Sequence, residues 1–147
     1  MTYQQIKELL GSQDRVNYGS AIGGRKGNVW IERRAGGIAV RLHHTDVVLF
    51  TPHWIELDTG GWVTPTTRDA ICTLSPVQVA SAGKSGWVVR LKGESWQDDG
   101  HPYYDGIRIS TDGARLMRSQ PNRPESFTPA RTISGFTGEL LGYGRRY

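Results

Sequence analysis

Apolar and polar residues alternate with a period of two between Val29 and Asp58, and no other feature of the sequence constrains the fold as strongly. Successive side chains of a β-strand point to opposite faces of a sheet, so this pattern is typical of strands with one buried face. It predicts four consecutive strands near residues 29–32, 38–42, 45–50 and 54–58. Only short turns separate these segments, which predicts an antiparallel meander.

Glycine and proline, with 19 and seven residues, predict many turns and therefore favour short strands over long helices. Two short helices are nevertheless expected. The first covers residues 2–10, because Thr2 and Gln5 have the spacing of a capping box and the apolar residues form one stripe. The second covers residues 66–76, "TTRDAICTLSP", with Thr66 as its N-cap.

Further strands are expected at residues 77–80, 86–92, 104–110 and 114–118. The predicted fold class is therefore α+β, with a curved antiparallel β-sheet, or a small β-roll or barrel, and one or two short helices. From residue 119 onward the sequence is rich in proline, glycine and arginine and has no clean period. We expect a single domain over residues 1–118 and a partly ordered C-terminal extension over residues 119–147.

The sequence gives little support for a metal site, a cofactor site or a site of covalent chemistry. The single cysteine, Cys72, excludes an internal disulfide and a multi-cysteine zinc site. The adjacent His43 and His44 point to opposite faces of a strand, so they cannot share one metal without a bulge. The acidic residues within 98–105 lie among turn residues, which favours solvated turns over the rigid carboxylates of a nuclease. We predict no metal, no cofactor and no catalytic residue, and we do not expect an enzyme.

Positive charge gathers near residue 30 and near the end of a chain whose net charge is +4 and whose isoelectric point is about 9.5. Most of the 18 basic residues are arginines, which pair bidentately with phosphate and stack on rings. This composition favours a nucleic-acid-binding surface on which aromatic rings stack on bases. The predicted phosphate contacts are Arg25, Lys26, Arg34, Arg145 and Arg146, and the predicted stacking residues are Trp30 and Tyr143.

Residues 56–71, "ELDTGGWVTPTTRDAI", allow two interpretations. In the first they form a structural corner: Gly60 and Gly61 adopt positive φ, and Trp62 folds back over the sheet. Threonine hydroxyls then satisfy backbone groups and cap the helix that follows. In the second, hydroxyls, an arginine and the start of a helix converge into an anion site. The predicted anion-binding residues are Thr64, Thr66, Thr67 and Arg68.

The stretches "RLHHTDVVLF", "ELDTGGWVTPTTRDAI" and "SGWVVR" resemble a family of small, uncharacterised proteins encoded in bacteriophage genomes. Members show an L-H-x-T-D-V-V run, then G-G-W-x-T-x-T-T followed by lysine or arginine, then a strand that bears a tryptophan. The resemblance spans about residues 28–89 and departs at Cys72, where many members carry an asparagine. It implies a phage or prophage origin and a binding function, and it assigns no chemistry.

Three functions follow from these patterns and stay open at this point. The first is a small phage accessory protein that binds nucleic acid through a basic, aromatic-containing surface. The second is a protein-binding module that inhibits a host enzyme or a host antiviral defence. The third is a virion structural protein. No apolar run approaches the roughly 20 residues of a membrane span, so we expect no membrane partner and a location in the host cell cytoplasm.

Overall fold

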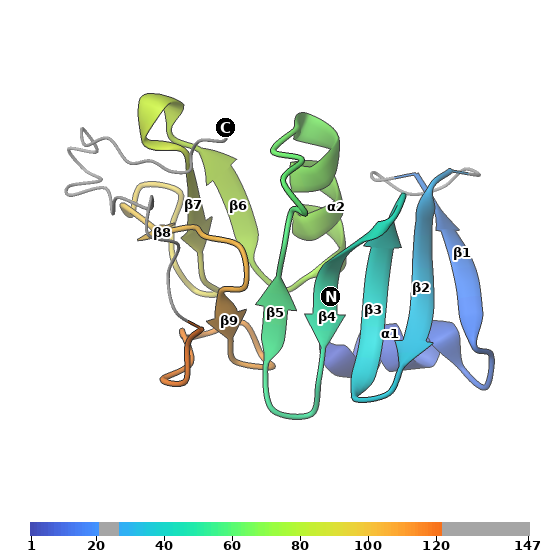
Figure 1. Ribbon diagram of the computed structural model, residues 1–147. Coiled ribbons are helices and arrows are strands. Elements are labelled where there is room, and N and C mark those ends of the chain that lie inside the picture. The colour runs from blue at the N-terminus through green and yellow to red at the C-terminus, as the bar shows by residue number, and fades with distance from the viewer. Residues whose placement is uncertain (21–26, 122–147) are drawn as a thin grey trace.

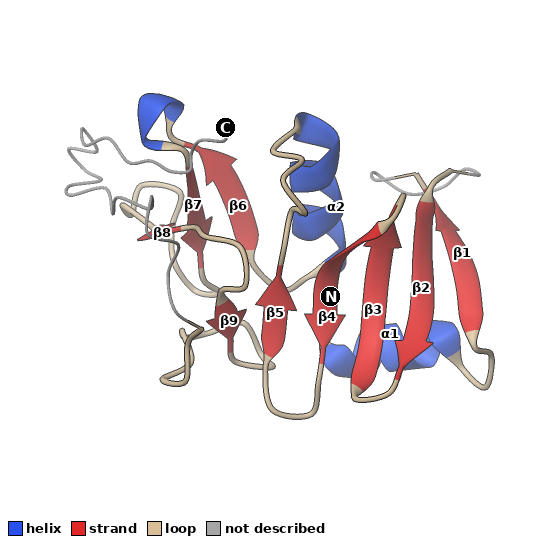
Figure 2. Cartoon of the chain, viewed as in Figure 1, coloured by secondary structure: helices blue, strands red, loops and turns tan. Residues whose placement is uncertain are grey.

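The computed structural model describes residues 1–20 and 27–121, and these residues form an α+β fold (Figure 1 and Figure 2). In chain order the elements are α1 (Tyr3–Leu10), β1 (Arg15–Gly19), β2 (Val29–Arg34), β3 (Gly37–Leu42), β4 (Thr45–Phe50), β5 (Ile55–Leu57), α2 (Pro65–Leu74), β6 (Gln78–Ser81), the 3-10 helix η1 (Gly83–Ser85), β7 (Trp87–Arg90), β8 (His101–Pro102) and β9 (Arg108–Ile109). The expected meander and both expected helices are present.

The described strands form two antiparallel sheets. The larger sheet has six strands in the order β1-β2-β3-β4-β5-β9, and the smaller one has the order β6-β7-β8. In Figure 1, β1 lies at one edge of the larger sheet and β9 at the other. This sheet is therefore open and does not close into the barrel that was one expected alternative. The prediction of an α+β fold with an antiparallel sheet and two short helices is confirmed.

The meander has the register that its alternation predicts. Ile31 pairs with Val40 and Val40 pairs with Val48, so these side chains share one face of the sheet. The register shifts between Val40 and Arg41 because Val47 is an extra residue in β4, a β-bulge. Both Val47 and Val48 are buried. The apolar face of the sheet is the inner one, and the opposite face carries polar side chains.

One hydrophobic core joins both sheets and both helices. Ile6 and Leu10 of α1 are fully buried in it, and so are Ile71 and Leu74 of α2. Burial of each such side chain contributes about 2 kcal/mol to the free energy of folding. Trp87 of β7 is 6% exposed and belongs to the same core, as its place in the alternation of that strand predicts.

The start of α2 differs from the prediction by two residues. Thr64, not Thr66, is the N-cap, and its hydroxyl accepts the N–H of Thr67 at 3.2 Å. Pro65 occupies the first turn, where its fixed φ suits a helix and its missing N–H leaves no helical bond unmade. The capping box at the start of α1, between Thr2 and Gln5, is confirmed.

The predictions were weakest for strands at the sheet edges. β1 was not predicted, because its sequence "RVNYG" has one aliphatic side chain and no alternation. β9 is only two residues long, and the strand expected at residues 114–118 is reduced to one bridge between Ile109 and Leu116. β8 lies in a segment for which a loop was expected.

The predicted boundary at residue 118 stays a prediction, as does the extension beyond it. The side chain of Gln120 accepts hydrogen bonds from the phenol of Tyr104 and from the N–H of Arg108. The chain is therefore still attached to β9 at this point, and residues 122–147 lie outside the described part of the structure.

Candidate binding site

We call residues 58–67, which join β5 to the first turn of α2, the Trp62 corner. Gly60 and Gly61 have φ angles of +62° and +90°, which glycine adopts without strain. The carboxylate of Asp58 accepts the N–H of Gly60 at 2.6 Å, and the hydroxyl of Thr59 accepts the N–H of Gly61 at 3.1 Å. The side chains of the corner thus satisfy its own backbone, as the first of the two interpretations expected.

Asp105 holds the Trp62 corner from a distant part of the chain. Its carboxylate accepts the N–H and the hydroxyl of Thr59 at 2.8 and 2.9 Å, and the phenol of Tyr103 donates to it at 2.7 Å. Thr59 is 1% exposed, so water does not compete for these bonds. Hydrogen bonds to a charged acceptor are roughly twice as strong as neutral ones. The corner is therefore fixed to the loop that follows β8.

Gly60 also sets the distance between the corner and β4. A Cβ atom at Gly60 would lie 2.5 Å from the Oγ1 atom of Thr45, the first residue of that strand, which is too close for non-bonded atoms. A Cβ atom at Gly61 would meet open space. Gly60 is thus required by close packing and by its φ angle, and Gly61 by its φ angle alone.

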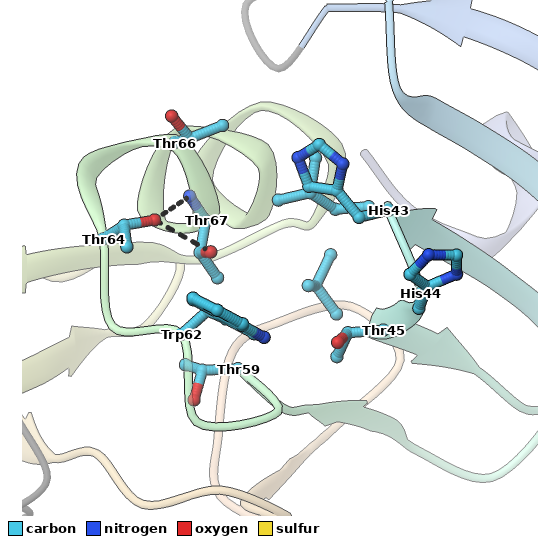
Figure 3. A pocket seen from close by; sticks show the side chains of 10 residues that line it. His43, His44, Thr45, Thr59, Trp62, Thr64, Thr66 and Thr67 are labelled. Atoms are coloured by element: carbon cyan, nitrogen blue, oxygen red, sulfur yellow. Dashed lines mark hydrogen bonds between the residues drawn. The ribbon is translucent and has the colours of Figure 1, made fainter.

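A hollow of about 490 Å³ lies between the Trp62 corner and the turn from β3 to β4, which consists of His43 and His44 (Figure 3). Aliphatic and threonine side chains complete its lining, and none of the described Asp, Glu, Lys or Arg residues takes part. Trp62 stands at its edge with the indole nitrogen turned toward Thr45 (Figure 3). Trp62 is 67% exposed.

The turn on the opposite side of the hollow contains a strained residue. His43 has a φ of 56°, the one positive φ among the described non-glycine residues. This conformation costs about 1 kcal/mol for a residue with a Cβ atom. The carbonyl of His43 accepts from the guanidinium of Arg41 at 2.7 Å, and its N–H donates to the carbonyl of Asn28 at 3.2 Å. These bonds hold the turn in place against the strain.

Three of the four predicted anion-binding residues, Thr64, Thr66 and Thr67, line the hollow, whereas Arg68 does not. The hydroxyl of Thr64 is already engaged by the N–H and the hydroxyl of Thr67, at 3.2 and 3.1 Å. The N–H of Arg68 donates to the carbonyl of Thr64 at 3.0 Å, and Pro65 has no N–H. The helix start therefore has little donor capacity left for an anion, and anion binding stays a prediction.

Two of the predicted nucleic-acid contacts, Trp30 and Arg34, lie in the described part of the chain. The guanidinium of Arg34 donates to both carboxylate oxygens of Asp46, at 3.0 and 2.8 Å. The guanidinium of Arg15 lies 4.1 Å from the ring centroid of Trp30. Both side chains are thus engaged within the protein. The other predicted contacts, Arg25, Lys26, Tyr143, Arg145 and Arg146, lie outside the described residues, so the basic surface stays a prediction.

Glu32 is the centre of an ion-pair network on the polar face of the larger sheet, which we call the outer face. Its carboxylate lies 2.8 Å from Arg41, 2.9 Å from Arg34 and 3.7 Å from Arg15. Burial alone would raise the pKa of Glu32, but hydrogen bonds from Arg41 and Arg34 outweigh it and hold the pKa below its ordinary value. Arg15, Arg34 and Arg41 of this face therefore form ion pairs with a carboxylate of the same chain.

Sequence reasoning missed a second exposed tryptophan, Trp96, in the loop between β7 and β8. It is 78% exposed and borders a hollow of about 390 Å³ that Arg90 and Lys92 also line. The signal was present in "GESWQDDG", where a tryptophan without apolar neighbours has no stripe or strand face to join. A tryptophan that belongs to no apolar stripe or strand face is expected to be exposed.

The described residues contain no group suited to a metal ion, and Cys72 lacks the features of a reactive thiol. Within residues 1–20 and 27–121 no three His, Cys, Asp or Glu side chains are grouped to hold a metal ion. The thiol of Cys72 forms 3.3 Å hydrogen bonds with both the N–H and the carbonyl of Val79 and so covers the free edge of β6. Burial raises the pKa of the Cys72 thiol, which disfavours the reactive thiolate. None of the described helices has the length and apolar character needed to cross a membrane.

Comparison with protein-family models, with curated proteins and with solved structures finds no match to this chain. The resemblance to small phage proteins therefore stays an expectation. Function has to be inferred from the geometry of the Trp62 corner and its hollow.

Proposed function

We propose that this protein is a binding module and that a protein partner docks at the Trp62 corner. The observation that carries the proposal is the indole of Trp62, which is 67% exposed although the loop around it is fixed by hydrogen bonds. Tryptophan is enriched among the residues that dominate binding energy, because it removes a large apolar area from water. The hollow beside Trp62 is large enough to receive an apolar side chain of the partner.

Rigidity of the corner supports this function. Association costs free energy when a loop has to be ordered on binding, so a loop that is already ordered binds more tightly. The hydrogen bonds that Thr59 donates to Asp105 and that the N–H of Thr67 donates to Thr64 fix the segments before and after Trp62. The indole is therefore presented to a partner at little entropic cost.

The chemistry of the hollow favours a protein over a polyanion. Binding of a polyanion depends mainly on neutralisation of its phosphates by lysine and arginine, and the described residues place neither in the lining. The hydroxyl of Thr66 and the imidazoles of His43 and His44 suit the hydrogen bonds of a peptide backbone. On the resemblance to phage proteins, we expect the partner to be a host enzyme or a host defence protein in the cytoplasm of the host cell.

The test compares wild type with Trp62→Ala and with the matched control Trp96→Ala, which removes the other exposed tryptophan. Each protein is immobilised and incubated with nuclease-treated host lysate, and captured proteins are quantified by mass spectrometry. We expect one stoichiometric partner on wild type and on Trp96→Ala and its loss on Trp62→Ala. Equal capture by all three proteins would refute docking at the corner.

Nucleic-acid binding is the second candidate, and the hollow beside Trp96 favours it. An exposed indole next to Arg90 and Lys92 is the combination with which single-strand binders stack bases and contact phosphate. The expected result is oligonucleotide binding that is lost in Trp96→Ala and kept in Trp62→Ala. Its affinity should fall with salt, with a log–log slope of about −0.7 per contacted phosphate. An affinity that does not depend on salt concentration, or the absence of binding at low salt, would exclude this candidate.

A further inference from the structure

The hollow at the Trp62 corner continues onto the outer face of the larger sheet. His44 and Thr45 line it, and the same two residues line a second, more open hollow of about 540 Å³. Unlike the first, the second hollow is lined by charged residues. Arg34 and Arg41 line it and are already paired with carboxylates of the sheet. The carboxylates in the lining are Asp46, Glu56 and Asp58. A partner segment seated at Trp62 meets these carboxylates where it extends past Thr45.

Asp58 differs in its partners from the other two carboxylates of the second hollow, Asp46 and Glu56. Asp46 is held by Arg34 through both oxygens, and Glu56 pairs with Arg108 at 3.0 Å. Among the residues that the structure describes, Asp58 forms no ion pair and its carboxylate accepts one backbone N–H. Its negative charge therefore has no ion-pair partner among the described residues, at a position that lines the second hollow and belongs to the Trp62 corner.

The surroundings of Asp58 make the arrival of a cation favourable. Burial raises the pKa of Asp58, and the charges of Asp105, Glu56 and Asp46 raise it further against one opposing backbone hydrogen bond. A carboxylate in a half-buried, negative environment is stabilised by a cation and repels an anion. At Asp58 this electrostatic preference is the reverse of the one that phosphate needs.

We infer that the partner segment carries a basic residue beside an apolar one, so that the apolar side chain enters the hollow at Trp62 and the lysine or arginine pairs with Asp58. This inference rests on the proposed protein-binding function and adds the charge of the partner to it. The hollow supplies affinity through apolar burial, and the carboxylate selects among apolar segments by charge.

The test uses the full-length protein and a displayed library of random peptides, selected on wild type and depleted on Trp62→Ala. Calorimetric titration then compares a selected peptide with the same peptide carrying glutamine at the basic position. Both are titrated into wild type, Asp58→Asn and Asp99→Asn. Asparagine at position 58 keeps an acceptor for the N–H of Gly60 and removes only the charge, and Asp99 is exposed and lines neither hollow.

We expect the selected peptides to combine a basic with an apolar residue, and the glutamine version to bind wild type about fivefold more weakly. The difference should vanish on Asp58→Asn and persist on Asp99→Asn. Selected peptides without a basic preference, or a difference that survives in Asp58→Asn, overturn the inference and leave the protein-binding function standing. If no peptide depends on Trp62, the proposed function fails and the inference with it.

Discussion

The outer face of the larger sheet and the Trp62 corner both combine tryptophan with polar side chains, and they use them in opposite ways. On the outer face the guanidinium of Arg108 lies 4.3 Å from the ring centroid of Trp54 and pairs with Glu56. Arg15 covers Trp30 in the same manner and lies 3.7 Å from Glu32. Each ring is covered and each of these charges has a partner within the chain.

At the Trp62 corner the polar side chains bind the backbone and leave the ring bare. The acceptors of Asp58, Thr59 and Thr64 are engaged by nearby N–H groups, and the indole between them stays exposed. The comparison teaches that a dense run of arginine and tryptophan need not mark a binding surface, because such residues satisfy one another. An exposed ring on a fixed loop is the feature that the fold itself does not use.

Removal of the Asp105 carboxylate, which anchors the Trp62 corner, should have the largest effect on stability. Asp105→Ala leaves the N–H and the hydroxyl of Thr59 without their acceptor in a buried position. We expect the free energy of unfolding to fall by about 3 kcal/mol, as measured by urea denaturation. Asp99→Ala, at an exposed position, is the control and should change little. A loss below about 1 kcal/mol in Asp105→Ala would show that the corner is not held from this side.

Substitution of the two glycines of the corner should distinguish the effect of close packing from the effect of backbone strain. Gly61→Ala introduces a Cβ atom into open space at positive φ, so the free energy of unfolding should fall by about 1 kcal/mol. Gly60→Ala adds a clash with Thr45, and we expect a total loss of about 2–3 kcal/mol. Denaturation of the two variants side by side measures the difference. Equal losses would mean that the corner does not pack closely on β4.

On the outer face, Glu32→Gln should lower the free energy of unfolding by about 1 kcal/mol near neutral pH, because three arginines lose their shared carboxylate. The pKa of Glu32 is lowered by folding, so its contribution is present above the ordinary value of 4.5 and is lost as pH falls through the folded-state pKa. The stability difference between wild type and Glu32→Gln should therefore shrink in acid. A difference that does not depend on pH would exclude a role for the charge.

Asp58→Asn should show the smallest effect and the opposite sign. Burial and the charge of Asp105 raise the pKa of Asp58 in the folded protein, so ionised Asp58 disfavours folding. Asp58→Asn should be slightly more stable than wild type at neutral pH. This advantage should disappear as pH falls through the raised folded-state pKa toward the ordinary value of 3.8. A variant less stable than wild type at neutral pH would mean that Asp58 already has a compensating charge.

The meander and the helices could be predicted because their signals are local. Alternation between Val29 and Asp58 defines the central strands, and the capping residues of α1 are three positions apart. β1 and the short β9 depend on pairing with strands formed elsewhere, and "RVNYG" has no pattern that reveals it. The N-cap of α2 was misplaced because three nearby threonines are equally suitable, and only the position of Pro65 separates them.

The site was predictable in its backbone and not in its side chains. Positive φ at Gly60 and Gly61 followed from the sequence, because glycine pairs after a strand favour such turns. The anchoring role of Asp105 did not, since it lies 46 residues from Thr59 and only the fold brings them together. The exposure of Trp62 and the pairing of Arg34 with Asp46 are likewise results of tertiary packing.

The five tryptophans provide the most direct test of partner docking at the Trp62 corner, because each indole N–H gives its own signal in a nitrogen–proton NMR spectrum. The spectrum is recorded while a peptide selected on the wild-type protein is added, and the signals are assigned with single Trp→Phe variants. We predict that the chemical shift of the Trp62 indole N–H changes until the protein is saturated with peptide. The signals of the buried Trp87 and the exposed Trp96 should keep their positions. A Trp62 signal that stays in place while Trp96 or Trp30 moves would contradict docking at the corner.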